Sequence, residues 1–197
     1  QRLHRDFGPS ILFGLCLLFW DVYVCLFYHI SACMRSAEAF GIQQVDVVNS
    51  VHQSNHFRPS SVVRGCGDWL STNNFSSIRD CSLELKKNNY RIYVAFPDQK
   101  TKNIASLDVT KPFAIVFGNE KNGTDPDWIK YADETFTVPM GGFVESLNIS
   151  VGAAISMYAL SNSCKQLLSD QDYYLSEQEQ YKVLCEWLRK KKPKWSI

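Results

Sequence analysis

The chain has 197 residues, of which 45% are hydrophobic and 21% are charged, and its formal net charge is +1. This length and composition fit one globular domain with a sizeable core. The small net charge excludes an overall positive field that would attract nucleic acid, so any RNA binding must depend on local basic patches.

Seven cysteines are scattered along the chain, and none of them forms a CxxC pair. An odd number without that spacing favours buried, reduced thiols in an intracellular protein over a disulfide framework. We therefore expect a cytoplasmic location. The cysteines are Cys16, Cys25, Cys33, Cys66, Cys81, Cys164 and Cys185.

Residues 11–28 form an apolar stretch that contains a single charged residue, Asp21. Its length reaches the threshold for a membrane-spanning helix, and Arg2 and Arg5 precede it. A carboxylate near the middle is costly in lipid, and the aromatic and β-forming residues also suit a buried strand. A buried strand with an atypical loop is therefore favoured, and a membrane or signal segment and a sequence artefact are the alternatives.

Residues 30–40 repeat apolar side chains at helical spacing, and Gly41 is a natural stop for that helix. Arg35 follows Met34 and can point away from the apolar face. On these residues alone it is interpreted as a solvated surface arginine. Residues 45–48 then predict a second strand.

The middle of the chain predicts two helices and one strand, at residues 58–70, 76–87 and 90–96. Ala95 and Phe96 end that strand, and we expect them to form one wall of a pocket. His52 and His56 are four residues apart and could share a helix face. No third ligand follows at a suitable spacing, so we expect no metal site.

Residues 113–160 carry the densest set of signals. An unbroken apolar run at 113–117 predicts a buried strand, which Gly118 ends and a short polar loop follows. Residues 135–140 predict a second strand, and after it the chain enters a helix of small residues at about Asn148. Each strand thus delivers a glycine-containing loop, and ligands of open α/β sheets sit at such carboxyl ends.

The C-terminal part begins with a capping box, in which Ser176 and Glu179 start a helix. The apolar face of this helix contains Tyr181, Leu184, Cys185 and Leu188. Residues 189–195 form a basic run that either is a frayed, solvated tail or contacts phosphates. Because strands alternate with helices along the chain, we predict an α/β fold with a mostly parallel sheet flanked by helices.

Short segments of this chain together resemble the three sequence motifs of the SpoU branch of the SPOUT RNA methyltransferases. Within that family they look most like the TrmH subgroup of tRNA 2'-O-ribose methyltransferases. The segments are ISACMRSAEAFG at 30–41, IVFGNE at 115–120, VPM at 138–140 and SLNISV at 146–151. Three motifs in the right order are specific, and the resemblance covers about residues 28–190. No GxGxxG follows a strand, which disfavours a Rossmann methyltransferase.

The resemblance implies a C-terminal trefoil knot over about residues 118–160, a homodimer, and S-adenosyl-L-methionine bound by the knotted loops. It places the first core strand at residues 17–22. It also implies three parts of the chain: an N-terminal strand and atypical loop at 1–28, the methyltransferase domain at 29–163, and a helical extension with a basic tail at 164–197.

The resemblance assigns residues to three roles. The expected catalytic residues are Arg35, Glu120, Ser146 and Asn148. The expected cofactor-binding residues are Ala95, Phe96, Gly118, Asn119, Val138, Pro139, Met140 and Leu147. The expected RNA-binding residues are His29, Lys165, Arg189 and Lys190.

Arg35 matches the family's activator of the ribose 2'-hydroxyl. Because a guanidinium stays protonated, we expect it to orient the hydroxyl and stabilise the developing alkoxide. His29 departs from the family, which has an asparagine there. The imidazole could replace the amide as a hydrogen-bonding group or act as a base, or it could mark a weakened enzyme.

The implied function is 2'-O-methylation of the D-loop guanosine at position 18 of tRNA. The alternatives are methylation of ribosomal RNA, a non-catalytic RNA-binding relative of the same fold, and a membrane-tethered form that uses residues 11–28.

Overall fold

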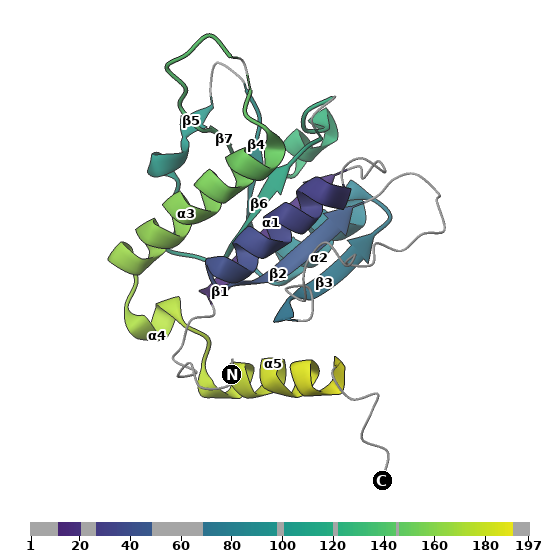
Figure 1. The fold of residues 1–197 in the computed structure, drawn as a ribbon, viewed down its shortest axis with the longest axis vertical. Coiled ribbons are helices and arrows are strands. Elements are labelled where there is room, and N and C mark those ends of the chain that lie inside the picture. Colours follow the sequence, from purple (N-terminus) through teal and green to yellow (C-terminus); the bar gives the residue numbers. More distant parts are fainter. Residues whose placement is uncertain are drawn as a thin grey trace.

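The computed structural model describes residues 12–20, 27–48, 69–97, 101–119, 122–144 and 146–190 (Figure 1). Its strands form one seven-stranded parallel sheet in the order β3-β2-β1-β6-β4-β7-β5. The strands are β1 (Leu12–Trp20), β2 (Ile42–Val48), β3 (Ser71–Phe75), β4 (Arg91–Ala95), β5 (Lys102–Asn103), β6 (Phe113–Phe117) and β7 (Glu134–Thr137). The helices are α1 (Phe27–Ala39), α2 (Ile78–Lys87), η4 (Ile104–Ser106), η5 (Pro126–Lys130), α3 (Ile149–Leu167), α4 (Asp170–Tyr173) and α5 (Glu177–Lys190).

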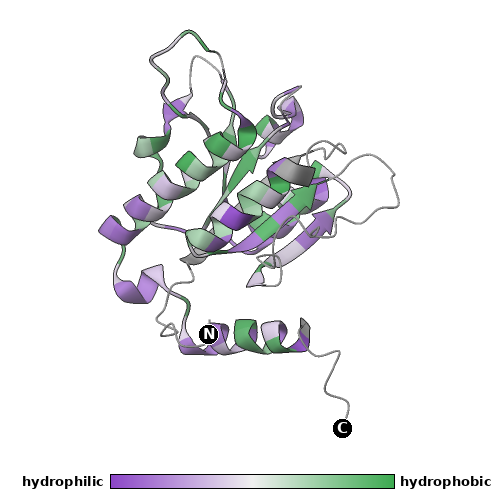
Figure 2. Ribbon diagram, viewed as in Figure 1, coloured by the Kyte–Doolittle hydropathy of each residue, from purple (hydrophilic) through white to green (hydrophobic). Residues whose placement is uncertain are grey.

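Helices cover both faces of the sheet. α1 and α3 pack against each other on one face, and α2 and η5 lie on the other (Figure 1). A strand in the middle of such a sheet must be apolar at every position. β6 meets this requirement, because Phe113, Ile115 and Phe117 join the core under α1 and α3, whereas Ala114 and Val116 join the core under α2. Figure 2 shows this concentration of hydrophobic residues along β6.

The apolar N-terminal stretch forms a strand of this sheet. β1 lies between β2 and β6, and Leu17 pairs with Val45 on one side and with Ile115 on the other. This confirms the strand interpretation, and the described strand runs from Leu12 to Trp20, whereas residues 17–22 were expected. The end of the predicted loop is helical, since α1 already begins at Phe27. No helix in the described part of the chain is long and apolar enough to cross a membrane.

Most other predicted elements are present with ends shifted by one to three residues. The second strand of the 113–160 region is shorter than predicted, because β7 ends at Thr137 and residues 138–140 are irregular. The predicted helix at 58–70 lies largely outside the described residues. Its last two residues, Trp69 and Leu70, are not in an α-helix, and Ser71 starts β3.

Local hydrogen bonds fix the ends of the helices as their sequences predict. Gly41 has a φ of 77°, which ends α1 in the left-handed conformation. The capping box of α5 is confirmed, because the Ser176 amide donates to Glu179 Oε2 at 3.0 Å and the Glu179 amide donates to Ser176 Oγ at 3.4 Å. α5 contacts the body through Trp187, whose Nε1 donates to the Trp69 carbonyl at 2.8 Å.

The cysteines whose side chains are described are free thiols, and Cys33, Cys81 and Cys164 are buried. Burial raises the pKa of Cys33 to about 12 and that of Cys164 to about 11. These thiols therefore stay protonated at neutral pH and pack as small hydrophobic groups. The prediction of buried, unpaired thiols is confirmed for these residues.

α3 continues to Leu167, beyond the predicted start of the C-terminal extension at residue 164. The division of the chain into three parts stays a prediction.

Two leucines on α2 give a test of how the core is arranged. Leu85 is buried under α2, whereas Leu83 on the same helix is exposed. We expect Leu85→Ala to lower the free energy of unfolding by about 2–5 kcal/mol because it leaves a cavity. Leu83→Ala should change it by less than about 0.5 kcal/mol. Urea denaturation followed by circular dichroism measures both, and equal losses would contradict this packing of α2.

Candidate active site

Three loops leave the sheet at one edge. β6, β4 and β7 are neighbours and run parallel, so their carboxyl ends lie side by side (Figure 1). This edge is where ligands bind in open α/β sheets. The structure brings together here the residues predicted to hold the cofactor, namely Ala95, Phe96, Gly118, Asn119, Val138, Pro139, Met140 and Leu147.

The loop after β6 is closed by contacts between backbone atoms. The Asn119 amide donates to the Gly123 carbonyl and the Gly123 amide donates to the Asn119 carbonyl, both at 2.9 Å. Gly118 is enclosed by this turn, because a Cβ added there would lie 1.9 Å from the Gly123 carbonyl oxygen. Gly123 has a φ of 70°, which glycine adopts at little cost. Residue 118 must therefore be a glycine, because any side chain there would collide with the Gly123 backbone.

Asn119 helps to hold the loop. Its side chain is buried, and its Oδ1 accepts a hydrogen bond from the Asn122 amide at 2.7 Å. This is a structural role in addition to the predicted cofactor contact. Glu120, the next residue and a predicted catalytic group, lies outside the described residues.

Thr124 joins the first loop to the next strand. Its hydroxyl donates to the Ala95 carbonyl at 2.7 Å, and the Phe96 amide donates to the Phe136 carbonyl at 3.1 Å. The ends of β6, β4 and β7 are thereby linked in series. Nothing in the residue pattern pointed to Thr124, because a threonine that closes a polar loop carries no distinctive signal.

The loop after β7 is largely exposed where it is described. Val138 and Leu147 are half-buried, whereas Pro139, Met140, Gly141, Gly142, Phe143, Val144 and Ser146 are exposed. A Cβ added at Gly141 or Gly142 would meet no atom within 4 Å. The loop tip therefore stands away from the rest of the described chain.

Asn148 caps α3 at the end of this loop. Its Oδ1 accepts hydrogen bonds from the Ser150 amide at 2.9 Å and from the Ser150 hydroxyl at 2.7 Å. The carboxamide oxygen is therefore used in the cap. The amide group of the same side chain donates to no described residue and remains suitable for a ligand.

Arg35 lies on the exposed side of α1, opposite the buried Met34 and Ala37. No hydrogen bond or ion pair connects it to the three loops where these are described. Within the described part of a single chain, then, no hydrogen bond or ion pair joins Arg35 to Ser146 or Asn148. His29, at the start of the same helix, is half-buried.

The other predicted RNA-binding residues lie away from the loops. Lys165 is seventeen residues beyond Asn148, which corresponds to about 25 Å along α3. Arg189 and Lys190 end α5. These three residues are therefore not gathered with the candidate site in one chain.

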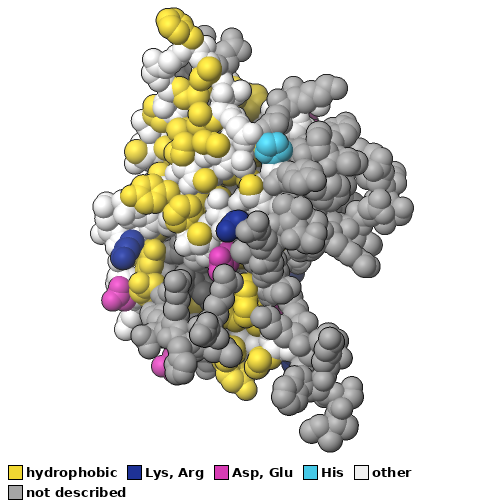
Figure 3. Space-filling view, in the orientation of Figure 1, with side chains coloured by type: hydrophobic (Ala, Val, Ile, Leu, Met, Phe, Trp, Pro, Cys, Tyr) yellow, Lys and Arg dark blue, Asp and Glu magenta, His cyan; other side chains and the backbone are white. Residues whose placement is uncertain are grey.

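An exposed apolar stripe on α3 was not predicted from the sequence. Val151, Ile155 and Tyr158 follow helical spacing and are 47%, 40% and 61% exposed. Figure 3 shows hydrophobic side chains gathered on the face that α3 and the preceding loop present. The signal in the sequence was hidden, because α3 is also apolar on its buried side, at Ala153 and Met157.

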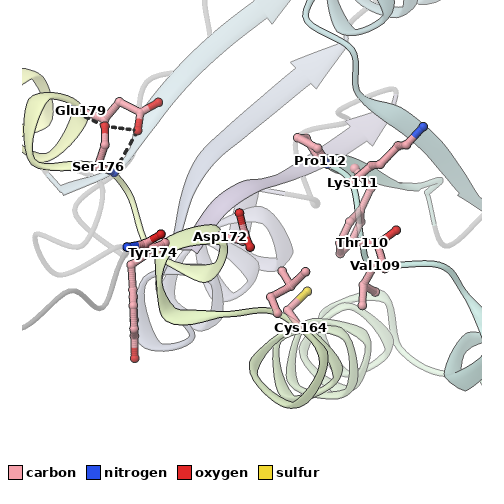
Figure 4. Close-up of a pocket in the computed structure, with 12 residues that line it drawn as sticks. Val109, Thr110, Lys111, Pro112, Cys164, Asp172, Tyr174, Ser176 and Glu179 are labelled. Atoms are coloured by element: carbon pink, nitrogen blue, oxygen red, sulfur yellow. Dashed lines mark hydrogen bonds between the residues drawn. The ribbon is translucent and has the colours of Figure 1, made fainter.

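A hollow of about 360 Å³ lies elsewhere, between the segment before β6, the end of α3, and the start of α5 (Figure 4). Thr110, Cys164, Asp172 and Tyr174 are among its lining residues. It lies at the amino end of β6, on the opposite edge of the sheet from the three loops.

The described residues contain no group of three or more histidines, cysteines or carboxylates that could hold a metal ion, and His52 and His56 lie outside them.

The chain is similar in sequence and in fold to known RNA methyltransferases. A tRNA (guanosine(18)-2'-O)-methyltransferase of Thermus thermophilus is 30% identical to this chain over 164 residues, which cover 83% of each chain. The crystal structure of the Aquifex aeolicus TrmH/SpoU tRNA modifying enzyme has a TM-score of 0.80 and 24% identity, over 92% of this chain and 90% of that one. An AdoMet-bound rRNA methyltransferase from Sinorhizobium meliloti has a TM-score of 0.66 and 18% identity, over 84% of this chain and 60% of that one.

The model of the SpoU rRNA methylase family matches residues 29–158, a range that includes α1, the three loops and the first half of α3. The resemblance carried by the three sequence motifs is thereby confirmed, and this chain belongs to the SpoU methylase family.

Proposed function

We propose that this chain transfers a methyl group from S-adenosyl-L-methionine to the 2'-hydroxyl of a ribose in RNA, with the D-loop guanosine at position 18 of tRNA as its target. The observation that carries the proposal is that the second and third family motifs lie in two neighbouring loops, at the carboxyl ends of β6 and β7. The Thermus relative, which acts on guanosine 18 by its name, supports the choice of target.

The residues at this edge fit the proposed cofactor. The Gly118–Gly123 turn fixes the loop after β6, and Val138 and Leu147 are half-buried with main chain outside any strand or helix. Such main-chain groups suit an adenosine and a methionine moiety, with Ala95 and Phe96 as the third wall. When bound, the sulfonium supplies an activated methyl group, so the protein has to align the reactants and assist loss of the hydroxyl proton.

Arg35 would stabilise the oxygen that develops negative charge during transfer. A guanidinium remains protonated at neutral pH and presents several donors, which suits a forming alkoxide better than proton abstraction does. Ser146 and Asn148, with Glu120, would supply the polar groups at the loop tips. His29, where the family has asparagine, would position the ribose or its phosphate.

A homodimer would complete this site. The stripe of Val151, Ile155 and Tyr158 leaves apolar area exposed on α3, which packs beside α1. A second copy that covers the stripe would bring its own α1 to the loops, and Arg35 would then serve the partner's pocket. This arrangement accounts for the separation of Arg35 from Ser146 and Asn148 within one chain.

We also propose the trefoil knot over about residues 118–160. Membership of the SpoU family supports it, because the resemblance to that family implies a knot in this region. The runner-up function is methylation of ribosomal RNA, for which the S. meliloti neighbour is a precedent in fold. A non-catalytic RNA-binding protein is the remaining alternative, motivated by His29.

The direct test is methyl incorporation from labelled S-adenosylmethionine into unmodified tRNA and rRNA transcripts, with nuclease mapping of the product. We expect a 2'-O-methyl group in the tRNA D-loop.

Arg35→Ala should lower the rate of methyl transfer by about 100- to 1,000-fold with cofactor affinity unchanged, because only transition-state stabilisation is lost. Arg79→Ala is the matched control, since Arg79 is an exposed arginine on α2 at the other face. Full activity of Arg35→Ala would remove the assignment.

Gly118 tests the cofactor pocket. Gly118→Ala introduces a Cβ that overlaps the Gly123 carbonyl, so the loop must move. We expect cofactor affinity measured by calorimetry to fall by about 100-fold, as misplacement of a binding loop does. Gly142→Ala, whose Cβ meets no atom, should bind like the wild type. Unchanged affinity of Gly118→Ala, with a normal melting temperature, would place the cofactor elsewhere.

The dimer is tested by placing a charge in the α3 stripe. Ile155→Asp should give a monomer at micromolar concentration by light scattering, whereas Leu83→Asp on α2 should remain a dimer.

Mixing and reassembling the Arg35→Ala and Asn148→Ala variants tests whether the two subunits share each active site. Mixed dimers hold one intact site if Arg35 serves the partner, so activity should return. A monomeric wild type, or no recovery on mixing, argues against the shared site.

A further inference from the structure

Phe143 is the most exposed large hydrophobic residue described, with a relative exposure of 109%. It stands at the tip of the loop between β7 and α3, next to Val144, which is also exposed. The backbone before it touches nothing, because an added Cβ at Gly141 or Gly142 would have no neighbour within 4 Å. Packing within the chain therefore does not explain an aromatic ring at this place.

The tip lies within reach of the candidate site. Phe143 is three residues before Ser146, so their Cα atoms are at most about 11 Å apart. A ribose whose 2'-oxygen is presented at Ser146 and Asn148 carries its base on the neighbouring carbon atom. The base of that nucleotide must then lie within a few ångströms of the reacting oxygen. That distance is shorter than the greatest separation of Phe143 from Ser146, so the ring can reach the base.

The chemistry of the loop favours a base over a phosphate. Residues 138–148 contain no lysine, arginine or histidine, and their single charged residue is Glu145. Such a loop attracts no phosphate, but an aromatic ring offers a face on which any unstacked base can lie. A flat dimer contact is the other use of an exposed ring. The stripe of Val151, Ile155 and Tyr158 already has the regular spacing for that, whereas Phe143 precedes the start of α3 by six residues.

We propose that Phe143 is the stacking platform for the base of the RNA nucleotide whose ribose receives the methyl group. The inference rests on the proposed function and extends it, because it names the residue that holds the target base, at the tip of the loop between β7 and α3. Stacking reads the face of a base rather than its edge, so Phe143 contributes affinity and placement, and base identity is selected elsewhere.

The test measures RNA binding to the full chain for two transcripts. One is the unmodified tRNA, and the other has an abasic nucleotide at position 18, or at the nucleotide that nuclease mapping identifies. We expect Phe143→Ala to weaken binding of the intact transcript by about 5- to 100-fold, the range measured for loss of one stacked base. Phe143→Trp should bind nearly as the wild type does, and Val144→Ala is the control for a neighbouring exposed apolar residue.

The abasic transcript isolates the contact in a double-mutant cycle. If Phe143 stacks on the target base, Phe143→Ala and the wild type should bind the abasic transcript equally, because that transcript has no base for the ring to contact. Equal losses from Phe143→Ala on both transcripts would place the ring against another part of the RNA and overturn the proposal. Dissociation of Phe143→Ala into monomers in light scattering would assign the ring to the second copy and overturn it as well.

Failure of this inference is distinguishable from failure of the proposed function. Methyl transfer that proceeds with unaltered RNA affinity in Phe143→Ala would overturn the stacking role and leave the activity in place. Phe143-dependent binding of the intact transcript, without methyl transfer by the wild type, would overturn the activity alone. Absence of any RNA binding by the wild type would overturn both.

Discussion

The candidate site depends on one close approach between backbone segments, at Gly118. The turn that returns at Gly123 passes so near that no side chain fits between them. This contact sets the direction in which the chain leaves β6, and it delivers Thr124 to the Ala95 carbonyl. The steric requirement at Gly118 therefore helps to link the end of β6 to that of β4, and the Phe96 amide links β4 to β7 through the Phe136 carbonyl. The loops that follow these three strands are thus held next to one another.

The parts of the fold that the sequence predicts well are those whose two faces are both covered. β6 is readable as an unbroken apolar run because α1 and α3 cover one face and α2 covers the other. β3 was missed for the complementary reason. Its sequence, Ser71–Phe75, is polar and half-exposed, and it lies at the edge of the sheet, where pairing with β2 needs no apolar pattern. An edge strand forms because its backbone pairs with that of the neighbouring strand, and its own residue pattern does not reveal this pairing.

The candidate site was predictable to the extent that its residues sit at the ends of recognisable elements. Gly118 and Asn148 lie where a buried strand ends and where a helix begins, and both positions carry a local signal. Thr124 and Phe143 carry none, because their roles depend on distances between loops that are set by the order of strands in the sheet. Arg35 is intermediate, since its motif identified it while the structure places it on the exposed side of α1 with no described hydrogen bond or ion pair to the three loops.

Charge pairing limits how this surface can hold RNA. Five described ion pairs bind cationic side chains to carboxylates: Lys86–Asp133, Lys87–Glu84, Arg91–Asp108, Lys102–Glu134 and Lys130–Asp127. Each pair removes a cation that could otherwise meet a phosphate, and the whole chain has a net charge of only +1. An RNA that binds here gains less from counterion release than it would on a strongly basic protein. The charge-dependent part of the affinity must then come from local basic patches, and the proposed stacking on Phe143, in the loop after β7, would add a part that does not depend on charge.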